Sequence, residues 1–236
     1  MKSKKQTFVS FSVALTVIAV WFFSLWLLLG LELATLQVYL IPFLILWQTF
    51  LYTGLFITAH DAMHGQVVPS NRRWNNATGA VITFLYALFS FRNLLDKHWD
   101  HHKYPASNGD PDYHDGKHSG FFAWYFRFMR NYIQWRQIVG MAIIYNVLLH
   151  ILKIPNLNII LFWVIPALLS TVQLFYFGTF LPHRDTSTPF ADRHRARSLT
   201  MPVWISFFSC YHFGGFHHEH HLHPSVAWFD LPKHKR

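Results

Sequence analysis

Histidine is concentrated in three short segments of the chain, at spacings that suit metal binding. The first segment, HDAMH, places His60 and His64 four residues apart and therefore on one face of a helix. The second, HWDHH, carries His98, His101 and His102, whose three rings a helix can turn toward one spot. Imidazole is a good ligand for zinc, copper, iron and nickel. These two segments predict a metal centre built on helices.

The third segment, FHHEHH at residues 216–221, allows two choices of ligand. Under one choice the ligands are His217, His220 and His221, which repeat the spacing of the second segment. Under the other, His218 replaces His220 in an equally narrow arc. Helix geometry alone does not decide between them, but the repeated spacing favours the first set.

The number of candidate ligands predicts two ions rather than one. His183 joins the candidates because it follows the last apolar run of the chain, at the same edge as His60. A structural zinc site closes with four ligands, usually including cysteine, and the chain has a single cysteine. We therefore predict a site for two metal ions, each with four to five ligands. Its candidate ligands are His60, His64, His98, His101, His102, His183, His217, His220 and His221.

Carboxylates near these segments are candidates for orienting the rings. A metal-bound histidine usually donates its other ring N–H to a carboxylate or a carbonyl. The candidates, each of which could equally be a surface charge, are Asp61, Asp100, Asp110, Asp112 and Glu219. Six further histidines stand apart from the segments, and we expect ordinary positions at a membrane edge for His114, His118, His150, His194, His212 and His234.

The three segments resemble those of the membrane fatty-acid desaturase and hydroxylase superfamily, which carries one H-x3–4-H box and two H-x-x-H-H boxes. Within it, HDAMHG, HWDHHKYPASNGDPDYH and FHHEHHLHP resemble the carotenoid ketolases, oxygenases that act at carbon 4 of the β-carotene ring. The resemblance covers residues 55–224. It implies a non-haem di-iron centre on the eight box histidines, molecular oxygen as co-substrate and an external reductant such as ferredoxin. His183 corresponds to an extra histidine that some members use.

The rest of the chain predicts an all-α membrane protein. Apolar residues make up 52% and charged residues only 13% of its 236 residues, whereas soluble domains are roughly 25% charged. Uncharged runs predict about four transmembrane helices, at residues 8–31, 33–59, 137–152 and 157–181. The apolar run at residues 77–91, flanked by basic residues, predicts a helix or a re-entrant pair at the interface. Residues 120–136, which mix aromatic residues with arginines, predict an interfacial helix. We expect one domain over residues 1–236.

The net charge of +9 points to a membrane surface rather than to nucleic acid, because the basic residues flank apolar runs. This pattern predicts that both termini and the histidine segments lie on the cytoplasmic side, with residues 31–37 and 154–158 opposite. The single cysteine excludes an iron–sulfur cluster held by four cysteines, so electrons must come from a partner. Basic residues that could dock an acidic partner such as ferredoxin, or equally bind anionic lipid, are Arg193, Arg195, Arg197, Lys233, Lys235 and Arg236.

Two alternative functions remain open at the level of the sequence. One is a related enzyme, either a carotenoid hydroxylase or an acyl-lipid desaturase, because the boxes are common to all of them. The other is a histidine-lined metal transporter, although transporters place their ligands near the middle of the membrane. If the substrate is a lipid-soluble polyene, the aromatic residues before His60 could line its access, or they could be ordinary lipid-facing or core residues. These are Trp47, Phe50, Tyr52 and Phe56.

Overall fold

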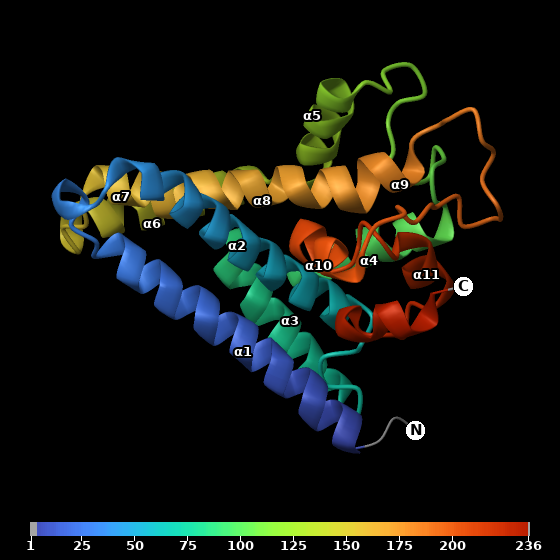
Figure 1. Cartoon of the computed structure of the whole chain (residues 1–236), viewed down its shortest axis with the longest axis horizontal. Helices are drawn as coiled ribbons and strands as arrows, with labels where there is room; N and C mark the ends of the chain where they lie inside the picture. The colour runs from blue at the N-terminus through green and yellow to red at the C-terminus, as the bar shows by residue number, and fades with distance from the viewer. Residues whose placement is uncertain (1–3, 236) are drawn as a thin grey trace.

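The computed structural model describes residues 4–235, and all regular structure in that range is helical (Figure 1). Of the basic residues named above, Arg236 lies outside the described residues. Three stretches are long and apolar enough to cross a membrane: α1 (Lys4–Leu29), Val38–Met63 and Asn156–His183. The predicted all-α membrane fold is therefore confirmed.

The observed helix bounds differ from the predicted spans in two places. The second span was predicted to begin at residue 33, but the residues before Ile41 form short 3-10 turns, η1 (Leu33–Thr35) and η2 (Val38–Leu40). The helix α2 (Ile41–Met63) begins where Pro42 occupies its first turn, a position that proline favours. The helix predicted at residues 137–152 is found as α6 (Trp135–Asn146) continued by the π turn η3 (Val147–Ile151), but it is shorter than the three long apolar stretches.

The two predicted interfacial segments each lie mainly in one helix. The first, residues 77–91, overlaps α3 (Arg72–Ala87) and ends at the 100° bend that leads into α4 (Phe91–Lys103). Asn71 and Ser90 cap these two helices, because their side-chain oxygens accept backbone N–H groups of the first turn. The second segment forms α5 (Phe121–Tyr132). The place of these helices relative to a membrane stays a prediction.

The last long helix contains two π turns. Its parts are α7 (Asn156–Ile159), η4 (Ile160–Val164), α8 (Ile165–Phe175), η5 (Tyr176–Phe180) and α9 (Leu181–His183). Each π turn ends two residues before a proline, Pro166 or Pro182. Proline inside a helix lacks an N–H and crowds the preceding turn, and the wider π turn makes room for it. The helix therefore continues unbroken to His183.

The C-terminal part folds back over the end of this helix. It comprises α10 (Val203–Cys210), α11 (His217–Leu222) and the 3-10 segment η6 (Trp228–His234). Between α10 and α11, Gly214 and Gly215 lie so close to Phe177 and Ser206 that a Cβ atom would collide with them. Figure 1 shows α4, α9 and α11 together at the end of the molecule that also holds both termini, opposite α7.

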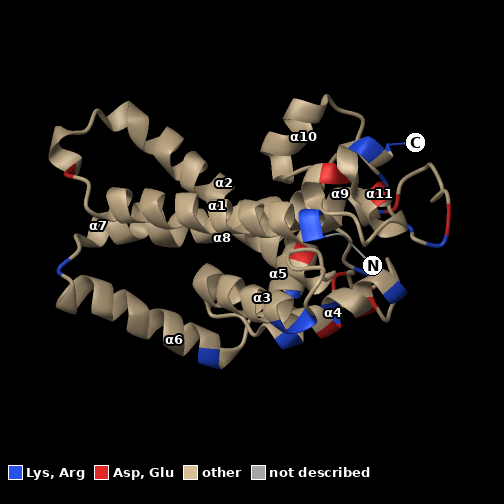
Figure 2. Cartoon of the chain, turned by 90° about the horizontal axis from the view of Figure 1, so that it is seen from below, with Lys and Arg blue, Asp and Glu red and all other residues tan. Residues whose placement is uncertain are grey.

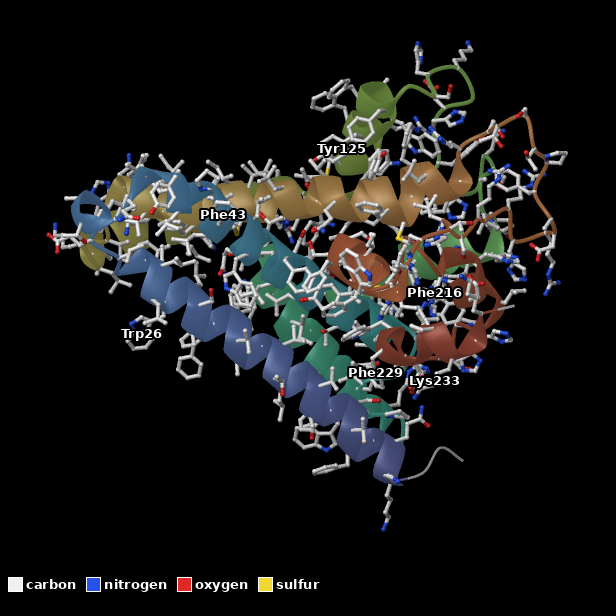
Figure 3. The ribbon with its side chains drawn as sticks, in the orientation of Figure 1. Trp26, Phe43, Tyr125, Phe216, Phe229 and Lys233 are labelled. Atoms are coloured by element: carbon white, nitrogen blue, oxygen red, sulfur yellow. The ribbon has the colours of Figure 1, made fainter. Side chains whose placement is uncertain are left out.

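The core forms around α2, while α1 presents apolar side chains outward. Tyr52 is fully buried between Trp21 and Tyr86, with each pair of rings packed edge to face. In contrast, Trp26 on α1 is 64% exposed and points away from the helices (Figure 3). The buried Asn158 donates to the carbonyl oxygens of Leu28 and Leu31 at the C-terminal end of α1, where the last helical turn lacks its own N–H partners. Such pairing is required in hydrocarbon, where water cannot satisfy backbone groups.

Candidate metal centre

Nine histidines converge in two adjoining groups at the end of the molecule formed by α4, α9 and α11. Five of them, the five-histidine group, are His60, His64, His98, His102 and His220. The other four, the four-histidine group, are His101, His183, His217 and His221. Within each group all candidate ligand atoms lie within 4.8 Å of one another. The structure thus brings together all nine histidines that the sequence singled out.

The local structure at the end of α2 determines the positions of the His60 and His64 rings. His60 lies in the last turn of α2, and His64 is the residue that ends it. Gly65 follows with a φ of 72°, the left-handed conformation in which glycine commonly terminates helices. The side chain of Asn75 then donates to the Ala62 carbonyl oxygen and accepts from the next loop, which holds this turn against α3.

Each of the two H-x-x-H-H boxes contributes histidines to both groups. The expectation that the three rings of a box point to one spot is therefore wrong. His98 and His102 belong to the five-histidine group, but His101 belongs to the four-histidine group. In the third segment the division is mirrored: His217 and His221 lie in the four-histidine group, and His220 lies in the other. Residues four apart on a helix differ by only about 40° in direction, so each such pair stays together.

The ring nitrogens are arranged as a shared cation would require. In the five-histidine group, the Nε2 atoms of His64 and His98 lie 2.6 Å apart, and those of His102 and His220 lie 3.0 Å apart. In the four-histidine group, His217 Nε2 lies 2.9 Å from His183 Nε2 and 3.1 Å from His221 Nε2.

Nitrogens that bind one ion at about 2.1 Å are separated by roughly 3 Å. The convergence of so many Nε2 atoms therefore fits two metal ions better than a hydrogen-bond network among neutral rings.

Two rings of the four-histidine group are oriented by oxygen atoms at their outer nitrogen. His101 Nδ1 lies 3.0 Å from both carboxylate oxygens of Asp110. Asp110 itself accepts backbone N–H groups from Ala106 and Asp112. His183 Nδ1 lies 2.7 Å from the carbonyl oxygen of Arg195. Such contacts place the N–H on Nδ1 and leave Nε2 free to bind a metal.

The other carboxylates named from the sequence have different surroundings. Asp112 is buried, accepts a hydrogen bond from the Tyr132 hydroxyl and lies 3.7 Å from His101 Nδ1. Asp61 lies 3.9 Å from His60 Nδ1, too far for a hydrogen bond, and accepts the backbone N–H of Trp228.

Two of these carboxylates do not orient a ring. Glu219 accepts a hydrogen bond from the Ser198 hydroxyl, which joins α11 to the loop before α10. Asp100 is exposed on α4 and lies in neither group. We therefore do not propose an orienting role for either residue.

Burial keeps the α11 rings in the form that binds metal. It lowers the pKa values of His217, His220 and His221 well below the usual value, so these imidazoles are neutral at pH 7. The two nearby carboxyls respond differently. Burial, reinforced by repulsion from Asp110, raises the pKa of Asp112 to about 6. Burial would also raise the pKa of Asp110, but the His101 ring lowers it below its usual range.

The structure distinguishes between the two choices in the third segment. His218 points away from both groups, and its Nε2 lies 2.8 Å from Asp192. Among the six histidines expected at a membrane edge, His114 and His212 are instead buried. His114 packs against the rings of Tyr113 and Trp124. None of the six lies in either group.

An apolar cavity of about 100 Å³ adjoins both groups. Its histidine wall includes rings of both groups, and its other walls come from α2, the bend between α3 and α4, α5 and α8. Apolar side chains among the lining residues are Phe56, Ile57, Met63, Phe89, Leu94, Phe128, Met129, Leu174 and Phe213. Cavities whose walls are mainly apolar can admit a small hydrocarbon ring.

The aromatic residues that precede His60 do not form one lining. Phe56 lines the cavity, but Tyr52 is fully buried in the core. Trp47 and Phe50 face an open groove on the outer side of α2. The two alternatives for these residues therefore divide among them: Phe56 adjoins the cavity, whereas Tyr52 belongs to the core.

A family model described as "Fatty acid desaturase" matches residues 39–149 and 129–236, which together include every histidine of both groups. The chain belongs to the fatty acid desaturase family. This membership and the long apolar helices identify a membrane protein, and they argue against the transporter alternative.

Relatives within the fatty acid desaturase family narrow the comparison. A "Beta-carotene ketolase" of Paracoccus sp. (strain N81106 / MBIC 01143) is 46% identical over 78% of this chain and 74% of its own length. A "Beta-carotene 4-ketolase 3" of Haematococcus lacustris is 40% identical over 79% of this chain and 59% of its own. A "Zeaxanthin 4-ketolase" of Chlamydomonas reinhardtii is 40% identical over 78% of this chain and 41% of its own length. The resemblance to carotenoid ketolases inferred from the motifs is confirmed.

Proposed function

We propose that this chain is a membrane di-iron oxygenase that converts the ring carbon-4 methylene of β-carotene to a ketone. One observation carries the proposal: two convergent histidine groups adjoin an apolar cavity in a chain 46% identical to a β-carotene ketolase. The substrate is too apolar for water, and a cavity lined mainly by apolar side chains suits it. A second ketone at the other ring would follow from a second binding event.

The proposed ligands are the nine grouped histidines, with one iron held by each group. Imidazole suits iron, and the Nε2 separations of about 3 Å fit ligands that share an ion. When bound, the iron pair would supply the oxidant that breaks the weak C–H bond next to the polyene. The protein contributes the rest: Asp110 and the Arg195 carbonyl orient rings, and the cavity holds the substrate ring away from water.

The proposed reaction consumes oxygen and electrons twice at each ring. In the first round, O2, two electrons and two protons convert the allylic C–H to C–OH and release one water. A second round gives a geminal diol, which loses water to leave the ketone. The described residues include one free cysteine, Cys210, which is buried, so the electrons come from a separate protein.

We propose ferredoxin as that donor, docked on exposed basic residues near the histidine end. Arg193, Lys233 and Lys235 are exposed; Arg195 is exposed as well, but Arg195 and Arg197 use their guanidinium groups to hold backbone carbonyls. Reversing the charge of Arg193, Lys233 and Lys235 should slow turnover with ferredoxin, more at low salt than at high salt. Unchanged turnover in that variant would leave lipid binding as their role.

We propose that the histidine end faces the cytoplasm. Figure 2 shows Lys and Arg gathered where α4 and α11 lie and few charges at the end marked by α7. Positive charge favours the cytoplasmic side of membrane proteins. A cysteine placed at the exposed Ala34 should react only from the opposite side, and buried Cys210 should add little background. Labelling of residue 34 from the cytoplasm would contradict this orientation.

Expression in a host that makes β-carotene tests the function. Each ring conversion should add one oxygen and remove two hydrogens, and the conjugated ketone should shift absorption to longer wavelength. A hydroxylase would add oxygen without loss of hydrogen and with almost no change of colour. A desaturase would leave the carotenoid intact and alter the acyl chains. Either of these results would contradict the proposal.

A further inference from the structure

Gly178 contributes no side chain to the wall of the cavity, although no neighbouring atom would clash with a side chain at this position. Gly178 lies in η5 and is the one glycine among the described residues that line the cavity. A Cβ atom added there would meet no heavy atom within 4 Å. At Gly54 and Gly79, in contrast, an added Cβ would collide with an aromatic ring. Packing therefore does not explain the glycine at position 178.

Backbone conformation does not explain it either. The glycines with a positive φ in the described chain are Gly65 and Gly116, and Gly178 has helical backbone inside a π turn. Glycine weakens a helix interior relative to alanine, because it loses more conformational freedom. The chain thus carries a residue that disfavours this helix where neither space nor geometry demands it. Single π turns occur frequently at functional sites.

The missing side chain would project toward the space beside the histidines. Thr171, Leu174 and Gly178 all line the cavity, and their spacing of three and four residues places them on one face of the helix. The same helix ends five residues later at His183. His98, His101 and His220 line other parts of the same cavity.

We infer that Gly178 determines the width of the substrate site, leaving room beside the histidines for the methyl-bearing end ring of a carotenoid. The inference rests on the proposed function and extends it to a specificity-determining residue. An unbranched acyl chain is only one methylene wide and would not need the missing side chain. A six-membered ring with methyl substituents is broader, so it benefits from each atom removed from the cavity wall.

The test is a graded series at this position. Gly178→Ala should lower ketone formation from β-carotene roughly tenfold and Gly178→Leu by more than roughly 100-fold, as for extra methylenes in a tight apolar pocket. Protein yield and bound iron should stay unchanged, and Gly178→Ala should be at least as stable to heat as the wild type. Gly120→Leu is the matched control, because Gly120 also has open space around it but is exposed and does not line the cavity.

A second-site change separates the loss of space from other effects. Leu174 lines the cavity one turn before Gly178, so Leu174→Ala should return space in the Gly178→Leu background. The double variant should recover part of the lost product. Wild-type ketone formation by Gly178→Leu, a loss of iron or protein that parallels the loss of product, or no recovery in the double variant would overturn the inference.

Retention of substrate separates this inference from the proposed function. Wild-type protein purified in detergent from a host that makes β-carotene should carry carotenoid, and Gly178→Leu should carry much less. A wild type that retains β-carotene but makes no ketone would contradict the proposed function while the retention difference still supports the role of Gly178. Equal retention in both proteins would contradict that role, whatever the activity.

Discussion

The four-histidine group is buried throughout, whereas three rings of the five-histidine group, those of His64, His98 and His102, are only half-buried. The groups also differ at the outer ring nitrogens. In the four-histidine group, His101 and His183 have oxygen partners at Nδ1, whereas the buried Nδ1 atoms of His217 and His221 have no described hydrogen-bond partner. In the five-histidine group, the buried Nδ1 atoms of His60, His64 and His220 all lack a described partner.

This difference implies two sites of unequal rigidity. Rings held by a carboxylate or a carbonyl keep their orientation without a metal, whereas rings held by packing alone depend more on the ion itself. We therefore expect the four-histidine group to hold its ion more firmly. The more exposed five-histidine group should exchange its ion more readily.

Loss of a grouped ring should have the largest effect. His220→Ala should abolish ketone formation and release metal from the five-histidine group, because it removes one of five converging ring nitrogens. His218→Ala is the matched control two residues away, and it should keep most activity because His218 pairs with Asp192. Product and metal per chain measure both effects. Equal losses in the two variants would refute the division of the third segment.

Loss of an orienting carboxylate should have a smaller effect, confined to one group. Asp110→Asn removes the charge beside His101 and should weaken metal binding or activity by about 10–100-fold. Asp100→Asn should behave like the wild type, because Asp100 is exposed on α4. Metal titration of the purified variants provides the measurement. If both asparagine variants bind metal as the wild type does, Asp110 has no orienting role.

When a chelator removes the metal, the two histidine groups should differ in the rate at which they release their ions. The ion of the five-histidine group should leave first, with a rate roughly tenfold higher than that of its neighbour. Time-resolved metal release from the purified protein should then show two phases. In Asp110→Asn the slow phase should become faster and the fast phase should not change. A single phase in the wild type would contradict the proposed inequality.

The helices and the candidate ligands followed from the sequence because both depend on local patterns. Uncharged runs predicted the long helices, and repeated histidine spacings predicted the ligands that the structure brings together. The division of each box between two groups did not follow, because it depends on how α4 and α11 face each other across more than 100 residues. The cavity likewise depends on the packing of several distant helices.

The orienting groups show where more could have been predicted. The helical angles that put His98, His101 and His102 on one face also place Asp100 on the opposite face, so its exposure was predictable. The contact of His183 with the Arg195 carbonyl left no such signal. It is a backbone contact across 12 residues, made where Arg195 adopts a φ of 43°. Sequence patterns of side chains carry no information on such a carbonyl.

Elemental analysis of the purified protein tests the central claim most directly, namely that the nine histidines form two iron sites. The wild type should contain about two irons per chain and little zinc, as two all-imidazole sites would allow. His183→Ala, which opens the four-histidine group, should reduce the content to about one iron. Zinc in place of iron, or a single iron that His183→Ala leaves unchanged, would contradict the account.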